Sequence, residues 1–420
     1  MTSNTPKHVC IVGGGVIGLS VAYYASRRGF RVTVVERLPA QRDGCSFGNA
    51  GMVVPSHFVP LAAPGMVALG LKWMWNPESP FYIKPRLSWD LMQWGLKFWQ
   101  ASSRKRVAAA SPLLRDLNLA SRACYEQIMD SGLDCGLKRN GLLMLCKTQH
   151  ALDEEAEMAE QAIRLGVPAE VHNAKSLSSV DPDVTMDVAG GVYFPLDCHL
   201  QPERYVDGLE KAIVANGGTL MWNTHVEKWH FEQERIRAIN TSVGTIEADQ
   251  FILCAGSWSG ENAKQLDLKL PMQAGKGYSL TIAEPKQLPK ICSIFVEARI
   301  AVTPMGQTLR FGGTMEMSGL NEEIDPRRVK GIIKAVPKYY PQFRIEDFNG
   351  IQPWRGLRPC SPDGLPYLGH TKRYSNLIVA TGHAMMGLSL APITGKLVAQ
   401  LLAGEKTEID LTLLNPDRYR

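Results

Sequence analysis

Three glycines and one glutamate near the start of the chain have the spacing of a dinucleotide-binding turn. Gly13, Gly15 and Gly18 form G-x-G-x-x-G, and Glu36 follows at the distance typical of such sites. Gly13 permits a sharp turn, Gly15 lets the backbone approach a pyrophosphate, and Gly18 lets the following helix pack close to the strand. The carboxylate of Glu36 can accept hydrogen bonds from ribose hydroxyls. These residues predict dinucleotide binding; a glycine-rich turn without a ligand is the alternative.

The elements that must position these residues form a βαβ unit. An apolar run at 8–12 predicts a strand, residues 16–28 a helix, and residues 31–36 a second strand. The chain then continues into a small-residue loop instead of further βα units, which favours a bound flavin over an exchangeable nicotinamide. Near the C-terminus, 376–380 predicts a strand and 387–402 a helix. The N-terminus of that helix could stabilise a reduced flavin, or the segment is one more βα unit.

Composition sets the broad class. The 420 residues are 45% hydrophobic and 21% charged, which predicts a globular protein of two domains. The net charge of +5 includes no run of like charges, so we expect no nucleic-acid partner. The nine cysteines include no C-x-x-C pair and predict reduced thiols. We expect no metal site, no signal peptide and a cytoplasmic location.

Residues 66–101 hold five of the nine tryptophans. The simplest interpretation is two amphipathic helices packed on the rest of the protein. The alternative is a peripheral contact, through residues 66–106, with the inner face of the cytoplasmic membrane, because lysines and arginines lie beside the aromatic side chains.

Three further stretches carry a family resemblance. They are CSFGNAGMVVP at 45–55, GLRPCSPDGLPYLG at 356–369 and ATGHAMMGLSLAPITGKLVAQLL at 380–402. Together with the opening motif, they resemble the D-amino-acid oxidase family of flavoproteins, and most closely its D-amino-acid dehydrogenase branch. The resemblance implies an α/β Rossmann-type FAD-binding domain (1–60, 190–265 and 345–420). It also implies a discontinuous α+β substrate domain with a mixed sheet (61–189 and 266–344).

The resemblance also implies which residues bind FAD. The expected set is Gly13, Gly15, Val16, Ile17, Gly18, Glu36, Arg37, Ser46, Asn49, Ala50, Gly51, Val226, Ala255, Gly256, Trp258, Gly382, Gly387, Leu388 and Ser389. Some relatives attach FAD covalently through a cysteine, but His383, Ala384, Met385 and Met386 follow Gly382 here. We therefore expect FAD to be bound noncovalently.

On the substrate side, Arg358 is similar to the arginine that binds the substrate carboxylate in this family. A guanidinium is planar and permanently charged, so it can bind a carboxylate through two parallel hydrogen bonds; a structural ion pair is the alternative. Tyr278, Arg310 and His57 are further candidates for the substrate site. His383 is either a participant or a helix-entry residue.

The implied reaction is oxidation of an α-amine. Hydride passes from Cα to the flavin, and water then hydrolyses the imine to a 2-oxo acid and ammonia. With a cyclic secondary amine such as D-proline, the product is a cyclic imine instead. A D-amino acid, D-proline or D-hydroxyproline fits as substrate, with a quinone or a redox protein as electron acceptor. The alternatives are a 2-hydroxy-acid dehydrogenase and a non-catalytic flavin subunit for electron transfer.

Overall fold

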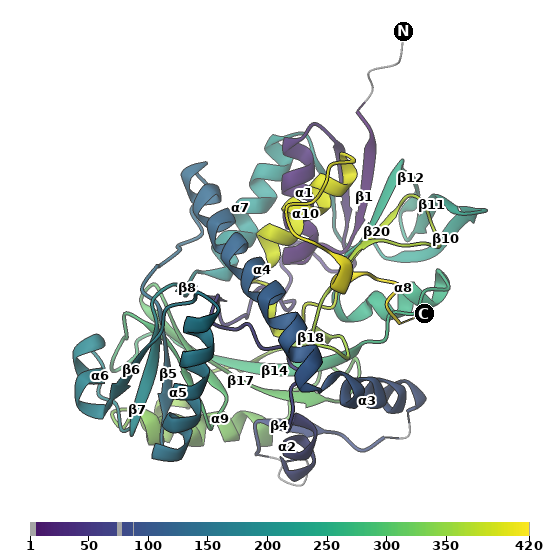
Figure 1. The fold of residues 1–420 in the computed structure, drawn as a ribbon. Helices are drawn as coiled ribbons and strands as arrows, with labels where there is room; N and C mark the ends of the chain where they lie inside the picture. The colour runs from purple at the N-terminus through teal and green to yellow at the C-terminus, as the bar shows by residue number, and fades with distance from the viewer. Residues whose placement is uncertain (1–5, 74–77, 87, 420) are drawn as a thin grey trace.

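Two large sheets organise the protein, which is described here from a computed structural model covering residues 6–73, 78–86 and 88–419. Within these residues, one sheet has six strands and the other has nine. Figure 1 shows the smaller sheet and its helices in the upper half of the molecule and the larger sheet in the lower half. The long helix α4 (Arg104–Asp130) runs between the two halves.

The smaller sheet has the order β19-β20-β13-β1-β2-β9. Its parallel strands are β1 (His8–Val12), β2 (Arg31–Val35), β9 (Thr219–Met221), β13 (Gln250–Leu253) and β20 (Leu377–Thr381), and β19 (Tyr367–His370) pairs antiparallel at one edge. The strands β1, β13 and β20 are buried along their whole length or nearly so. This double burial explains why they read in the sequence as continuous apolar runs.

Both faces of the smaller sheet are covered. Val9 and Ile11 pack in one core with α1 (Val16–Arg27), α7 (Pro202–Ala215), α10 (Ala391–Leu402) and α4. The alternate residues Cys10 and Val12 pack on the other face with the antiparallel strands β10 (Val226–Glu232), β11 (Arg235–Thr241) and β12 (Gly244–Glu247) and with α8 (Ser259–Gln265). This arrangement leaves the carboxyl ends of the parallel strands free to form a site.

The larger sheet has the order β18-β14-β17-β16-β15-β5-β7-β6, and β4 pairs with β17. Its strands are β4 (Phe81–Ile83), β5 (Leu142–Cys146), β6 (Glu170–Asn173), β7 (Gly190–Phe194), β14 (Gln273–Ile282), β15 (Cys292–Phe295), β16 (Ile300–Met305), β17 (Thr308–Met317) and β18 (Trp354–Cys360). Helix α9 (Pro326–Tyr339) contributes to the core on one face, and α5 (Gln149–Arg164) to the core on the other.

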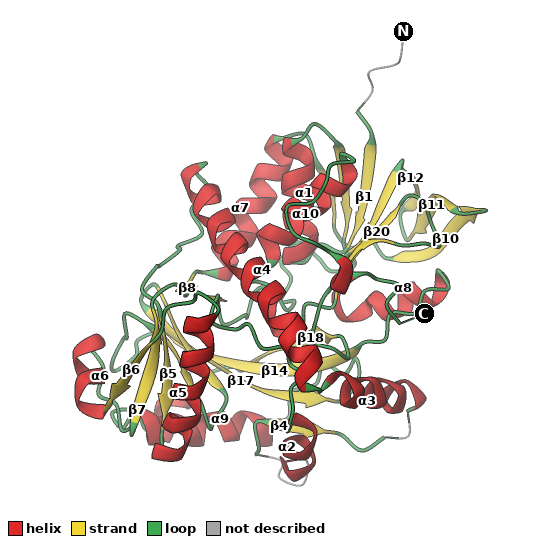
Figure 2. Cartoon of the chain, viewed as in Figure 1, coloured by secondary structure: helices red, strands yellow, loops and turns green. Residues whose placement is uncertain are grey.

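Shorter elements complete the chain. They are β3 (Met52–Val53), which pairs with β8 (Cys198–His199), the helices α2 (Met66–Trp73), α3 (Trp89–Ala101) and α6 (Ala174–Val180), and the 3-10 turns η1 (Gly256–Trp258), η2 (Ile345–Phe348), η3 (Ala384–Met386) and η4 (Thr412–Leu414). Figure 2 shows α3 at the edge of the molecule, close to α2 and β4.

The predicted fold class is confirmed, and the opening βαβ unit forms as expected. Strand pairing nevertheless places β7 and β18 in the larger sheet, although their residues fall in the segments predicted for the FAD-binding domain. The C-terminal helix begins at Ala391 and not at Gly387, because η3 and a turn precede it and Pro392 occupies the first helical turn. The two-domain division remains a proposal.

Gly395 of α10 lies where this helix contacts α1. A Cβ on Gly395 would lie 2.5 Å from the carbonyl oxygen of Ser20, so the two helix backbones touch without an intervening side chain. Gly395→Ala should therefore lower the free energy of unfolding by about 1 to 3 kcal/mol, measured by urea denaturation. Gly260→Ala in α8 is the matched control, because a Cβ there meets no described atom within 4 Å. Equal stability of the two variants would contradict the close packing.

Candidate active site

A pocket lies at the carboxyl ends of β1, β2, β13 and β20, and β18 of the larger sheet forms part of its wall. Its empty volume is about 1320 Å³, counted out to the open solvent at its mouth. Most residues predicted to bind FAD line it: Gly13, Gly15, Val16, Ile17, Glu36, Arg37, Ser46, Asn49, Val226, Ala255, Gly256, Trp258, Gly387 and Leu388. Arg358 and His383 line it too. The fold thus brings together residues from five distant parts of the sequence.

The glycine turn forms part of the pocket wall. Gly13 has a φ of 113°, in the region that favours glycine, and a Cβ there would collide with the carbonyl of Cys254. Gly18 does not line the pocket but packs behind the turn. A side chain at this position would collide with the carbonyl of Gly13, so glycine is required for the helix to lie this close to the turn. The backbone N–H of Val16, at the start of α1, donates to Ser46 Oγ at 2.8 Å. Ser46 thereby connects the loop after β2 to the N-terminus of α1, and a helix N-terminus at a pocket wall favours a negatively charged group.

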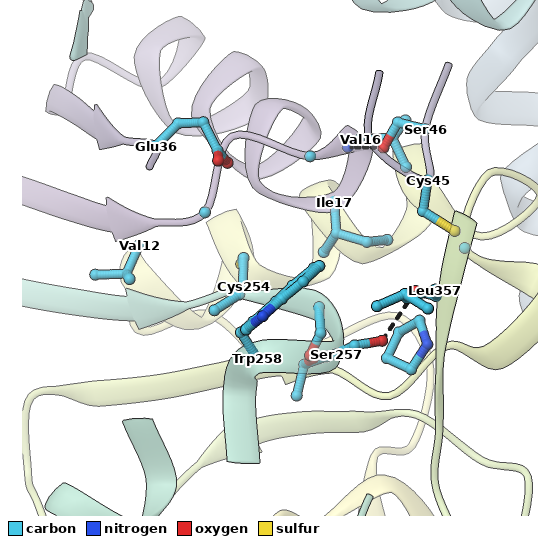
Figure 3. A pocket seen from close by; sticks show the side chains of 18 of the residues that line it. Val12, Val16, Ile17, Glu36, Cys45, Ser46, Cys254, Ser257, Trp258 and Leu357 are labelled. Carbon is cyan, nitrogen blue, oxygen red and sulfur yellow. Dashed lines mark hydrogen bonds between the residues drawn. The ribbon is translucent and has the colours of Figure 1, made fainter. Parts of the chain in front are cut away.

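Figure 3 shows Glu36 on the side of the pocket away from Cys45, with the ring of Trp258 between them and below. The Glu36 carboxylate accepts hydrogen bonds from the N–H groups of Gly14, at 2.7 Å, and Leu38, at 2.9 Å, and is therefore fixed at the end of β2. The guanidinium of Arg37 lies 3.6 Å from the ring centre of Trp258. Backbone N–H groups, a fixed carboxylate and aromatic surface suit the phosphates, ribose and base of a dinucleotide.

His383 also lines the pocket and is 2% exposed. Its Nε2 lies 3.0 Å from Thr394 Oγ1, whereas its Nδ1 is buried and has no hydrogen-bond partner among the described residues. An orphaned polar atom on the pocket wall fits a bound group that supplies the missing partner. Burial lowers the pKa of His383 to about 3, so the imidazole is neutral at physiological pH.

Arg358 lines the pocket from β18. Its Nη1 donates to the carbonyl of Thr314 at 2.8 Å, and no carboxylate of the described chain pairs with its guanidinium. Burial raises the pKa of the neighbouring thiols of Cys45 and Cys360, and the charge of Arg358 opposes that shift. A partly buried cation without an anionic partner is a ready site for a carboxylate.

Three predicted substrate residues lie elsewhere, and their contacts show why. Tyr278 faces α9 and donates to Glu316 Oε2 at 2.7 Å. Arg310 donates to the carbonyls of Phe47 and Asn49 and pairs with Glu203. His57 lies 3.0 Å from Ser56 Oγ, and burial lowers its pKa to about 4. In this structure, these side chains support strands and loops around the pocket and do not line it.

Four predicted FAD residues lie just behind the lining: Ala50, Gly51, Gly382 and Ser389. The hydroxyl of Ser389, for example, accepts from the N–H of Val54 at 3.1 Å and donates to the side chain of Asn118 at 2.7 Å. Its role here is to connect the loop after residue 51 to α4.

Arg42 is not among the residues predicted from the sequence, yet it lines the pocket and is 7% exposed. Its Nη2 donates to the carbonyl of Gly14 at 2.9 Å and to Glu210 at 2.6 Å, and its guanidinium lies 4.0 Å from the ring centre of Trp222. It therefore fixes the glycine turn. Nothing in the local sequence distinguishes it from a surface arginine, because its partners are distant in the chain.

A Rossmann sheet whose dinucleotide pocket is closed by a second, mixed sheet defines a two-sheet flavoprotein oxidoreductase. The chain belongs to the DAO family of FAD-dependent oxidoreductases, whose family model matches residues 8–401. The resemblance inferred from the motifs is thus confirmed, and FAD is the cofactor of this family. The residues of this chain fit FAD at three places: the glycine turn, the fixed carboxylate of Glu36, and Nδ1 of His383, which has no hydrogen-bond partner among the described residues.

Curated relatives and solved structures agree with this family. The chain is 32% identical to a D-amino acid dehydrogenase of Bradyrhizobium diazoefficiens over 98% of both chains, and 31% identical to one of Helicobacter pylori over 94% of both. Its fold is similar to that of glycine oxidase from Geobacillus kaustophilus, with a TM-score of 0.79, 23% identity and coverage of 99% and 100% of the two chains. L-proline dehydrogenase from P. horikoshii gives a TM-score of 0.74 at 16% identity, with coverage of 99% and 98%.

The burial of His383 should make the stability of the protein depend on pH. Because the pKa of the folded imidazole, about 3, lies below the ordinary value of 6.5, the unfolded state binds the extra proton between these values. The free energy of unfolding must then fall as the pH is lowered through this range. For each pH unit of acidification between about pH 6 and pH 4, the free energy of unfolding of wild type should fall by about 1.4 kcal/mol more than that of His383→Gln. Urea denaturation measures this difference.

The control for this measurement is His150→Gln, because the His150 side chain is 84% exposed and stays in contact with water in both states. It removes a histidine but no buried group. A flat difference between wild type and His383→Gln would contradict the burial of His383 as a neutral imidazole.

Proposed function

We propose that this protein is an FAD-dependent dehydrogenase of D-amino acids and that Arg358 binds the substrate carboxylate. The single observation that carries the proposal is the guanidinium of Arg358, which lines the cofactor pocket with no carboxylate partner among the described residues. The relatives at 30–32% identity that are named D-amino acid dehydrogenase support the choice of substrate.

The protein's own residues would act mainly by positioning the substrate. With Nη1 held by the carbonyl of Thr314, Arg358 keeps further N–H groups for a carboxylate, which fixes the substrate Cα relative to the pocket. FAD, when bound, supplies the hydride acceptor. His383 is neutral at physiological pH, so it would bind through a hydrogen bond and would not act as a cation. We propose that the amine enters in its neutral form, after its proton has been lost to water.

We further propose that the donor is a D-amino acid, with D-proline and D-hydroxyproline included in the class. The electron acceptor would be a quinone or a redox protein and not oxygen. FAD would be bound noncovalently, because the loop from Gly382 to Met386 contains no cysteine.

Anaerobic bleaching of the flavin absorbance tests this function. D-amino acids or D-proline should bleach the holoenzyme, and admitted air should restore the colour slowly. Arg358→Ala removes the carboxylate partner and should raise the substrate concentration for half-maximal bleaching by about 100-fold, because hydrogen bonds to charged groups contribute about 1.5 to 3 kcal/mol. The matched control is Arg139→Ala, since the Arg139 side chain is 58% exposed.

Other outcomes would contradict the proposal in distinct ways. Bleaching by 2-hydroxy acids alone would assign the enzyme to alcohols, and bleaching by no donor would indicate an electron-transfer subunit. An Arg358→Ala variant that is bleached as readily as wild type would remove the proposed carboxylate site.

We also propose that helix α3 contacts an anionic membrane surface, at the inner face of the cytoplasmic membrane. Four apolar side chains at helical spacing are exposed on it: Trp89 at 69%, Met92 at 61%, Leu96 at 56% and Trp99 at 63%. Exposed basic residues at 72 and 104–106 precede and follow α3 in the sequence. No helix in the described residues is long and apolar enough to cross a bilayer, so the contact would be peripheral.

The inner face of α3 reaches toward the pocket. Trp94 is 5% exposed, and its Nε1 donates to the carbonyl of Cys360 at 2.9 Å. It packs in one cluster with Met315, Cys360 and Ala384, and Ala384 lines the pocket. One helix thus connects the exposed apolar face to the substrate side, which suits an acceptor that is dissolved in lipid.

Co-sedimentation with phosphatidylglycerol vesicles tests this contact. Wild type should bind, and the double variant Trp89→Ser, Trp99→Ser should lose binding while its flavin is still bleached, because both rings lie on the outer face of α3. Val243→Ser, at another exposed apolar site, is the control and should bind as wild type does. Wild type that stays in the supernatant would contradict the membrane contact.

A further inference from the structure

The strand pair β14–β17 contains a bulge next to Arg358. Lys276 pairs with Glu316 and Tyr278 pairs with Gly313, so one residue of β14, Gly277, faces two residues of β17. One of these two is Thr314, whose φ of 64° lies in the left-handed region that β-branched residues avoid. Bulges of this kind redirect a strand locally and are frequent beside active sites.

The bulge turns a carbonyl toward the guanidinium. The oxygen of Thr314 accepts the hydrogen bond from Arg358 Nη1 at 2.8 Å. On the facing strand, a Cβ on Gly277 would coincide with the guanidinium of Arg358. Gly277 does not have a positive φ, so its backbone would accept another residue, and what the position requires is the absent side chain.

Lys276 and Tyr278, the residues before and after Gly277, are held by contacts on the face of the sheet opposite to Arg358. Lys276 Nζ lies 3.3 Å from Glu316 Oε1, and both side chains are at least nine-tenths buried. Tyr278 donates to the other oxygen of the same carboxylate. These contacts hold the residues on both sides of Gly277 in β14 to one carboxylate, that of Glu316 in β17. The register of the bulge therefore cannot slip without breaking a buried ion pair.

We propose that Gly277 is a positioning residue for the carboxylate site, and that its missing Cβ, together with the carbonyl of Thr314, determines where the guanidinium of Arg358 points. The inference rests on the proposed function, since it needs Arg358 to bind a carboxylate. Gly277 acts through Arg358 and need not touch the substrate.

Titration of the holoenzyme with benzoate, followed by the shift of the flavin absorbance, tests the inference. Benzoate supplies a carboxylate but has no α-amine to oxidise. Gly277→Ala should raise the Kd of benzoate by about tenfold or more, because a displacement of about 1 Å in a binding group has effects of that size. The matched control is Gly312→Ala in β17, whose Cβ would meet its nearest described neighbour only at 3.9 Å. Its Kd should equal that of wild type.

A double variant tests whether Gly277→Ala weakens benzoate binding through Arg358. In an Arg358→Ala background, Gly277→Ala should change the Kd by less than about twofold, because no guanidinium remains to be displaced. If Gly277→Ala alone fails to fold or to retain FAD, the double variant should recover both, since the Cβ then has space. A double variant that also fails would overturn the proposal.

The two proposals fail separately. If Arg358→Ala binds benzoate as wild type does, the proposed carboxylate site is wrong. If Arg358→Ala loses affinity but Gly277→Ala binds as tightly as Gly312→Ala, the carboxylate site stands and the positioning role of Gly277 is overturned.

Discussion

The arrangement of the site depends on a permanent positive charge kept at the pocket wall without a protein anion to neutralise it. Arg358 belongs to β18 of the larger sheet, yet it lines a pocket built mainly on the smaller one. The hydroxyl of Ser257 donates to the carbonyl of Leu357 at 2.9 Å and so joins η1 to β18 (Figure 3). Because a partly buried charge is costly, the fold must hold it in place and leave its remaining N–H groups for an anionic ligand.

Two other arginines stabilise the loops of the pocket by donating hydrogen bonds to backbone carbonyls. Arg310 binds the carbonyls of Phe47 and Asn49, and Arg42 binds the carbonyl of Gly14. Both also pair with a glutamate, so their charges are already neutralised. The ion pairs thus distinguish the two arginines that hold the loops around the pocket from Arg358, whose guanidinium is available for the proposed substrate carboxylate.

Local features of the sequence were predictable, and non-local ones were not. The turn at Gly13, the helix after it and the terminal Glu36 follow from glycine spacing and strand patterns within 30 residues. Tyr278 was predicted on the substrate side, but successive residues of a strand point to opposite faces, and it is the neighbouring Gly277 that faces Arg358. The bulge at Thr314 and the partners of Arg42 arise from pairing between distant segments, which leaves no local signal.

The most direct test is a crystal structure of the holoenzyme with benzoate bound. The account predicts the carboxylate within hydrogen-bond distance of the Arg358 guanidinium, with Nη1 still donating to the carbonyl of Thr314 and the ligand ring beside the flavin. A carboxylate bound by other residues, or an Arg358 turned to pair with a protein carboxylate, would contradict it.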